Sequence, residues 1–310
     1  MAITLLVSLT ALLVLEKPTR KTRCEDRMLG TLENPGVMTL TMKELFNAIK
    51  EKSSTRKYKI RFSYLEVYNE MIRDLLGEDP TEVLELREDP AKGLAVAGLS
   101  ERTGDTSEQV MKYLFKGNKN RTQESTGANE TSSRSHAVFQ ITVEYEERGE
   151  IRSGKLSLID LAGSERAART CNRGIRMVEG ANINRSLLAL GNCINKLSDQ
   201  ISKGQRLYIP YRDSKLTRLL KDSLGGNCQT VMIANISPSS ITYEDTHNTL
   251  KYANRAKNIK TKVIQNVRTA QHHIAQYAQM IGQLKQEILM LRRRLSSFKA
   301  DASSKSNIID

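Results

Sequence analysis

The sequence predicts an α/β core that is followed by a C-terminal coiled-coil helix. In several short segments apolar residues occupy every second position, as in strands with one buried face. Between these segments apolar residues recur every three or four positions, as in amphipathic helices. The helical spacing then continues without a break from Val267 to Phe298. A length of 310 residues accommodates one large domain and such an extension.

The core elements alternate along the chain, and strands are missing at its start. Thr106 and Gln109 form a capping box that predicts the start of a helix. A short buried strand from Leu156 to Ile159 places Asp160 at its carboxyl end, where ligands of α/β sheets usually bind. The other predicted elements are a helix through Met42 and Ile49, strands at 58–64, 137–145 and 230–236, a short irregular β region at 84–96, and helices near 110–114, 178–198, 213–223 and 243–258.

Residues 1–27 form an atypical N-terminal segment. An apolar run from Ile3 to Leu15 is followed by a basic stretch from Lys17 to Arg23. The run is shorter than the about 20 residues of a membrane span. It has the length of a signal-peptide core, but no basic residue precedes it and no clear cleavage pattern follows. We favour an alternative first exon or a gene-prediction artefact over secretion. A further alternative is that Leu5-Leu6-Val7 form a surrogate buried strand.

Composition indicates an intracellular globular chain with an anionic partner. The net charge is +13, which suits nucleic acid, an anionic membrane or an acidic protein polymer. The four cysteines are widely spaced without a Cys-x-x-Cys pair, so we interpret them as free thiols. The four histidines do not cluster like metal ligands.

Two loops have the composition of phosphate sensors. Residues 129–136 read Asn-Glu-Thr-Ser-Ser-Arg-Ser-His, and residues 160–165 read Asp-Leu-Ala-Gly-Ser-Glu. Gly163 allows a backbone N–H to approach a phosphate closely. Arg134 and Glu165 carry opposite charges that can pair and latch one loop to the other. The alternative for this pair is two solvated charges.

Hydroxyl and carboxylate side chains in these loops are candidate ligands. Ser132, Ser133 and Ser135 can offer oxygens to magnesium or hydrogen bonds to phosphate. The structural alternative is that the serines are turn hydroxyls and that Asp160 only caps the turn after its strand. The surrounding residues favour ligand roles.

The two strings resemble switch I and switch II of a kinesin motor domain. The resemblance runs from about Met28 to Lys262, and two further strings, Arg121–Glu124 and His273–Tyr277, are most similar to the kinesin-8 class, in particular its ciliary length-regulating member. The other strings that carry the resemblance are Ser63–Glu70, Glu179–Leu187 with Leu190-Gly191, Pro210–Leu220 and Asn248–Lys257.

The resemblance implies a domain organisation and a fold. Residues 28–258 would be a partial motor domain: an incomplete kinesin-type P-loop NTPase core with a central, mostly parallel sheet flanked by helices. Residues 259–266 would be the neck linker and residues 267–298 a coiled-coil neck helix. Residues 299–310 have no periodicity and are expected to be disordered.

The resemblance also implies an activity and its residues. An intact relative hydrolyses Mg-ATP as a microtubule motor, and the kinesin-8 class moves toward plus ends and shortens microtubules there. Asn129, Ser132, Ser133, Asp160 and Gly163 would bind the nucleotide. Magnesium would be held by Ser133 and, through water, by Asp160. Arg134, Glu165 and Gly163 would serve catalysis by closing the site and sensing the γ-phosphate.

The phosphate-binding loop that such a motor needs is not found in this sequence. The string Gly149-x-x-x-x-Gly154-Lys155 continues with Leu156 into a strand, where a P-loop would need Ser or Thr and a helix. Counting back from Met28 places Cys24 and Glu25 where the family has its phosphate-binding Lys and magnesium-binding Thr. We therefore expect little or no ATP turnover. The alternative to a motor is a non-hydrolysing microtubule-binding or dimerising fragment.

The resemblance also selects tubulin as the partner, over nucleic acid and membranes. The basic residues expected to face it are Arg166, Arg169, Arg173, Lys203, Arg206, Arg212, Lys215 and Arg218. The alternative is that such charges are merely solvated. The heptad seam from 267 to 298 favours a homodimer over docking of a single helix onto the motor, although Tyr277 and Gly282 weaken it. A cytoplasmic, cytoskeletal location follows, with the cilium as one site.

Overall fold

The computed structural model describes residues 10–16, 28–31, 33–89, 93–123, 134–162, 175–204, 206–259, 266–269 and 280–292. The chain divides into two compact units. The first comprises Met1–Tyr145 and Arg152–Asn266, and the second comprises Glu146–Ile151 and Val267–Asp310. The first unit carries the candidate site.

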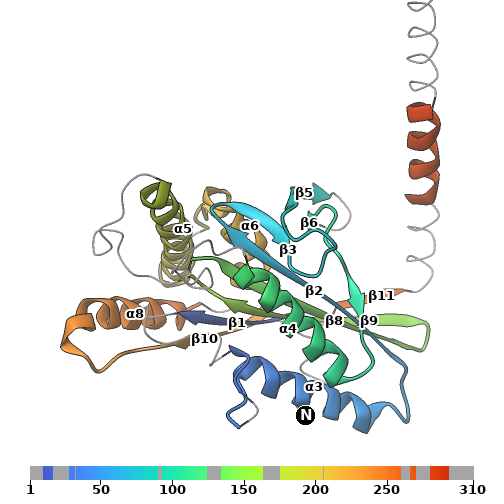
Figure 1. Cartoon of the computed structure of the whole chain (residues 1–310), viewed down its shortest axis with the longest axis horizontal. Helices are drawn as coiled ribbons and strands as arrows, with labels where there is room; N and C mark the ends of the chain where they lie inside the picture. The colour runs from blue at the N-terminus through green and yellow to red at the C-terminus, as the bar shows by residue number, and fades with distance from the viewer. Residues whose placement is uncertain are drawn as a thin grey trace, which may run out of the picture. The chain divides into compact units, whose positions relative to one another are not determined.

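A twisted central sheet forms the first unit's framework, with helices packed on it (Figure 1). Its strand order is β10-β1-β9-β8-β2-β3-β4, with β7 also paired to β2. The strands are β1 (Thr10–Glu16), β2 (Tyr58–Tyr68), β3 (Met71–Asp74), β4 (Val83–Leu84), β7 (Arg102–Thr103), β8 (His136–Glu147), β9 (Glu150–Asp160) and β10 (Cys228–Ala234). A separate two-stranded sheet consists of β5 (Leu86–Asp89) and β6 (Gly93–Val96).

The α/β fold class is confirmed, but the sheet is richer in antiparallel pairs than expected. The expectation was a mostly parallel sheet. β1 pairs in parallel with β10 and with β9, whereas β2 pairs antiparallel with β3, β7 and β8, and β3 with β4. The reason is connectivity: β2 and β3 are joined by a tight hairpin, which allows only antiparallel pairing.

Strand β1 occupies an interior position of the sheet, beside β10, that the sequence alone left open. Its residues pair with β10 on one side and with β9 on the other, so that Leu15 lies beside Asp160. A surrogate strand was one alternative for this segment, but at Leu5-Leu6-Val7, which lie outside the described residues. The observed strand is Thr10–Glu16. Its apolar run is typical of a parallel strand that is covered on both faces.

The predicted helices are present, with one of them divided. α4 (Ser107–Gln123) begins after Thr106, whose Oγ1 accepts from the Gln109 N–H at 3.3 Å, as the capping box predicted. Gln109 reaches back to the Asp105 N–H instead of that of Thr106. The helix expected near 213–223 is divided at Leu220 into two short helices. The helices are α3 (Val37–Lys52), α5 (Ile175–Lys203), η3 (Tyr211–Asp213), α6 (Lys215–Leu219), α7 (Lys221–Gly225), η4 (Ser240–Thr242) and α8 (Tyr243–Ala256).

Residues of β2 contribute to two separate apolar clusters. In β2, Phe62 and Tyr64 pack in one cluster with the buried faces of α3 and α4. Leu65 and Val67, each three positions further along, belong to a second cluster with buried residues of α5, α6 and α7. Because successive side chains of a strand point to opposite faces, helices cover both faces of the sheet.

The second unit differs from the predicted tail at its start. The coiled-coil helix was expected from residue 267, but residues Asn266–Thr269 form β11, which pairs with β9. Residues 280–292 are helical, within the predicted range. Residues 260–265 of the predicted neck linker and residues 299–310 lie outside the described residues. In the described part of the chain, no helix is long and apolar enough to cross a membrane.

Candidate functional site

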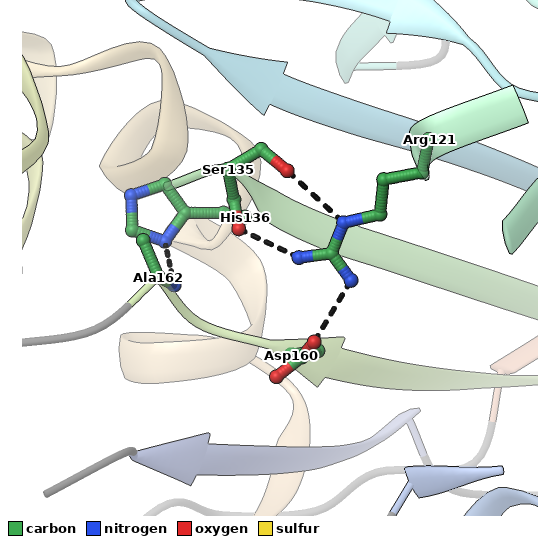
Figure 2. Close-up of polar contacts among 5 residues, drawn as sticks. All are labelled: Arg121, Ser135, His136, Asp160 and Ala162. Atoms are coloured by element: carbon green, nitrogen blue, oxygen red, sulfur yellow. Dashed lines mark hydrogen bonds and ion pairs between the residues drawn. The ribbon is translucent and has the colours of Figure 1, made fainter. Parts of the chain in front are cut away.

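The ends of the two predicted switch loops meet at one edge of the sheet (Figure 2). Asp160 is the last residue of β9, and His136 is the first residue of the neighbouring β8. Asp160 also lies at the carboxyl end of the parallel strands, beside Leu15 of β1. This is the edge at which ligands of α/β sheets bind.

Arg121 joins these two loop ends from the last turn of α4. Its Nη1 donates to Asp160 Oδ2 at 2.8 Å, and the two side chains are only 2% and 4% exposed. Its Nε donates to Ser135 Oγ at 3.0 Å and its Nη2 to the Ser135 carbonyl at 2.7 Å (Figure 2). One guanidinium thus fixes both the residue before β8 and the end of β9. Such multiple bonding is typical of arginine at a buried site.

Burial and charge shift several pKa values around Arg121. Burial alone would lower the pKa of Arg121, but the adjacent Asp160 carboxylate raises it, so the guanidinium stays charged. Burial raises the pKa of the Tyr64 hydroxyl to about 12. Burial also raises the pKa of the Glu66 carboxyl, whose Oε2 is buried without a hydrogen-bond partner. The charges in this cluster therefore depend on one another.

His136 links the switch ends to α5. Its Nδ1 accepts from the Ala162 N–H at 3.0 Å, which places the ring proton on Nε2 (Figure 2). Nε2 then donates to Ser186 Oγ at 2.7 Å, from the middle of α5. Both side chains are buried. The start of β8, the start of the second loop and α5 are thereby held as one cluster.

Most of the predicted loop ligands lie outside the described residues. Arg134 is described and is half-buried. The pairing of Arg134 with Glu165 stays a prediction. The predicted residues that lie outside the described part are Asn129, Ser132, Ser133, Gly163, Glu165, Arg166, Arg169 and Arg173.

Of the two residues that the resemblance implied as magnesium ligands, Asp160 lies among the described residues and Ser133 lies outside them. The Asp160 carboxylate, expected to reach magnesium through water, is ion-paired with Arg121. Among the described residues no group of three or more His, Cys, Asp and Glu side chains is arranged to hold a metal ion. By the resemblance, Cys24 and Glu25 would stand where a phosphate cradle needs a cation and a neutral ligand.

Arg121 is a functional candidate that the sequence pointed to only as the first residue of the string Arg121–Glu124. A signal for its role was present in the helix. Val110, Leu114, Gly117 and Arg121 follow the spacing of one helix face, and all four are buried. A charged residue on a buried face requires a partner of opposite charge. The partner here is Asp160, 39 positions further along the chain.

A second group of predicted residues, all of them basic, lies on η3, on α6 and at the end of α5. Leu216 and Leu220 are buried, which seats α6 on the second apolar cluster. Lys215 and Arg218 are half-buried on α6. The Arg212 side chain is 79% exposed, and its Nη2 lies 3.9 Å from Oε2 of the exposed Glu88. Arg206 is exposed, and Lys203 ends α5.

The family-model comparison decides the identity of this fold. The model for the kinesin motor domain matches residues 27–259. The chain belongs to the kinesin family. The human Kinesin-like protein KIF19 is 57% identical over 273 residues, which cover 86% of this kinesin and 27% of the relative. Mouse Kinesin-like protein KIF18B is 53% identical over 282 residues, covering 89% of this kinesin and 33% of the relative.

These relatives place the chain in the kinesin-8 class, as the sequence resemblance implied. The chain spans about a quarter to a third of their length. A KIF14 dimer with AMP-PNP in complex with a microtubule aligns with a TM-score of 0.76 at 38% identity, covering 84% of this kinesin and 74% of that chain. A fast kinesin aligns with a TM-score of 0.76 at 36% identity, covering 86% and 76%.

Proposed function

We propose that this kinesin binds microtubules through the basic surface of η3, α6 and the end of α5, and that it does so without hydrolysing ATP. The observation that carries the proposal is the packing of α6. Leu216 of α6 and Leu220, which directly follows the helix, are buried in the second cluster with Leu190, Ile194 and Leu197 of α5. The basic surface is therefore supported by the packing of α6 against α5.

Charge supports tubulin as the partner. Arg212, Lys215 and Arg218 lie within eight positions of one another on consecutive short helices. The chain as a whole carries a net charge of +13. Attraction to an acidic polymer should be strong at low salt and should weaken as the ionic strength rises. Structural similarity to a kinesin solved in complex with a microtubule supports the same partner.

The absence of hydrolysis follows from the phosphate chemistry. Phosphoryl transfer depends on positioned N–H donors, a cation and magnesium around the β- and γ-phosphates. The sequence has no Gly-x-x-x-x-Gly-Lys-Ser/Thr string, and Asp160 is engaged by Arg121. The alternative function is ATP-driven plus-end motility and microtubule shortening, which the joined switch ends at Asp160 and His136 favour.

Co-sedimentation with microtubules tests the proposal. We expect binding that ATP, ADP and nucleotide removal leave unchanged, together with no microtubule-stimulated ATPase. Replacing Lys215→Glu and Arg218→Glu together should weaken binding at least about tenfold, which corresponds to about 1.4 kcal/mol. The matched control is Lys43→Glu with Lys50→Glu on the exposed face of α3, which makes the same charge change on the other side of the sheet.

Each outcome has a defined meaning. ATP-dependent release, or turnover comparable to that of a complete motor, would contradict the proposal and favour the motor function. Equal loss of binding in the two double variants would show that overall charge, and not this surface, determines affinity. Circular dichroism of both variants checks that the helices are intact.

We also propose that the tail helix joins two copies of this chain. In the helix at 280–292, Ile281, Leu284, Ile288 and Leu291 follow spacings of three and four and are each 51–56% exposed. Heptad spacing of apolar residues favours a coiled coil. Leu284→Glu with Ile288→Glu should give a monomer in light scattering, whereas the off-seam control Gln283→Glu with Gln286→Glu should stay a dimer. A monomeric wild-type chain would refute dimerisation.

A further inference from the structure

We propose that the turn at Asn69 and Glu70 is a positioning element that holds α5 and α6 in their binding arrangement. Both residues are half-buried, and the turn joins β2 to β3 on the main sheet. Neither residue belongs to the predicted tubulin-facing or nucleotide-binding set. The inference rests on the proposed microtubule binding and names residues that would set its strength.

The backbone of this turn is unusual for its sequence. Tyr68 pairs with Met71, so Asn69 and Glu70 form a two-residue hairpin loop. Their φ angles are +50° and +60°, which lie in the left-handed region. Two-residue loops with two positive φ angles favour Asn-Gly, because glycine has no Cβ penalty there. Asn69 fits this rule, whereas Glu70 stands where glycine would be less strained.

The Glu70 carboxylate is bonded to the start of α6. Its Oε1 accepts from Ser214 Oγ at 2.8 Å, and its Oε2 accepts from the Lys215 backbone N–H at 2.7 Å. Ser214 Oγ in turn accepts from the Leu216 N–H at 3.0 Å. A helix leaves its first N–H groups without partners inside the helix, and a negative charge at that end is favourable. Glu70 and Ser214 together accept from the first two N–H groups of α6.

The neighbouring residue bonds to the other binding helix. Asn69 Oδ1 accepts from Asn182 Nδ2, near the start of α5. The two residues of one strained turn therefore contact α5 and α6 separately. α5 is also the helix that receives the His136 bond at Ser186. Strain of this kind persists where surrounding contacts determine the conformation, which these two sets of bonds do.

These bonds determine where the basic side chains lie. Lys215 is the first residue of α6, and Arg218 follows one turn later. If the Glu70 carboxylate is removed, the first turn of α6 loses its link to the sheet and is expected to fray. Lys215 and Arg218 are then presented less uniformly, and microtubule affinity falls.

Glu70→Gly is the decisive substitution because positioning and its alternatives predict opposite results. Glycine relieves the strain at φ +60°, so a turn with a purely local role should become as stable or more stable. Loss of a carboxylate also makes the chain more basic, so charge alone predicts tighter binding to an acidic polymer. Positioning instead predicts binding about fivefold weaker, because the two hydrogen bonds from Glu70 to the start of α6 are lost.

Two further variants keep the test independent of folding. Glu70→Asn tolerates a positive φ but is too short to make both bonds, so it should weaken binding as Glu70→Gly does. Glu70→Gln keeps an acceptor for the Lys215 N–H and should restore most of the affinity. The matched control is Glu44→Gln, which removes an exposed carboxylate from α3 and should not weaken binding.

Amide hydrogen exchange reports on the geometry directly. The Lys215 and Leu216 amides should exchange faster in Glu70→Gly and Glu70→Asn and stay protected in Glu70→Gln. Folded Gly and Asn variants that bind as tightly as the wild type would overturn the inference, as would unchanged protection at Lys215. If the wild-type chain itself does not bind microtubules, the proposed function fails, and faster exchange at Lys215 in these variants would still support the contact to α6.

Discussion

Substitution of Arg121 by methionine is expected to remove a large share of the chain's stability. Methionine matches the length of the arginine stem but leaves the Asp160 carboxylate, 4% exposed, without its cation. It also removes the donors to Ser135 Oγ and to the Ser135 carbonyl. Breaking a buried ion pair by removing one partner costs about 3–5 kcal/mol, because an uncompensated charge stays buried. Domains are typically stable by about 5–15 kcal/mol, so this loss is a substantial fraction.

Urea unfolding at neutral pH, followed by circular dichroism, measures this cost. Asp160→Asn is measured alone and together with Arg121→Met, and the double variant should lose less than the sum of the two single losses. Arg87→Met is the control, since Arg87 pairs with Glu85 at a site where both side chains are at least 70% exposed, and no measurable change is expected. A loss below about 1 kcal/mol in Arg121→Met with an unchanged m value, or strict additivity in the double variant, would refute the reasoning.

Three other predictions follow from the fold and its buried charges. Because burial raises the folded-state pKa of Glu66 above its ordinary value of 4.5, the folded state holds that proton more tightly, and stability should fall as pH rises from 4.5 through the folded pKa. Glu66→Gln should remove this fall in urea unfolding at a series of pH values, and an unaltered pH profile would contradict it. Leu13→Pro should lower the free energy of unfolding by about 1–3 kcal/mol, since Leu13 pairs with both Val231 and Leu158. Thermal unfolding measures this loss, with Leu13→Val as the control. An unchanged stability would exclude Thr10–Glu16 as a strand between β10 and β9. Gly117→Ala should cost about 1–3 kcal/mol, because its Cβ would lie 2.4 Å from Tyr64 Cδ1, and wild-type stability would argue against this close packing of α4 on β2.

Periodicity was sufficient to predict most of the core. The alternation at Tyr58–Tyr64 and the helical spacing at Met42–Ile49 correspond to β2 and α3. These elements are predictable because each exposes one face and buries the other, which leaves a pattern in the chain. The prediction was less accurate for β1, which forms part of a long apolar run. The position of β1 within the long apolar run from Ile3 to Leu15 could not be fixed, since such a run has no period to set the register.

The site was predictable where single residues carry a motif and was missed where two distant residues meet. Asp160 was placed at the end of its strand from local sequence, and the structure places it there. Its bond to Arg121 joins residues 39 positions apart, and no local pattern identifies that partner. The tail shows the same limit, because Val267 fits the heptad spacing yet lies in β11. Pairing with β9 there outweighs the helical preference of the segment.

The residues of strand β1 bear on the proposal that this chain binds microtubules without hydrolysing ATP. Pairing with β9 and β10 requires backbone N–H and C=O groups and apolar side chains, which the run Thr-Ala-Leu-Leu-Val-Leu-Glu supplies. A phosphate cradle instead requires particular residues, namely glycines for close backbone approach, a lysine and a hydroxyl. A segment can therefore complete a sheet without carrying phosphate-binding chemistry, since fold and function are specified by different residues. Helix α6, which carries Lys215 and Arg218, packs on the second apolar cluster, to which strands of the sheet contribute. ATP-insensitive microtubule binding is the outcome that this division of roles predicts.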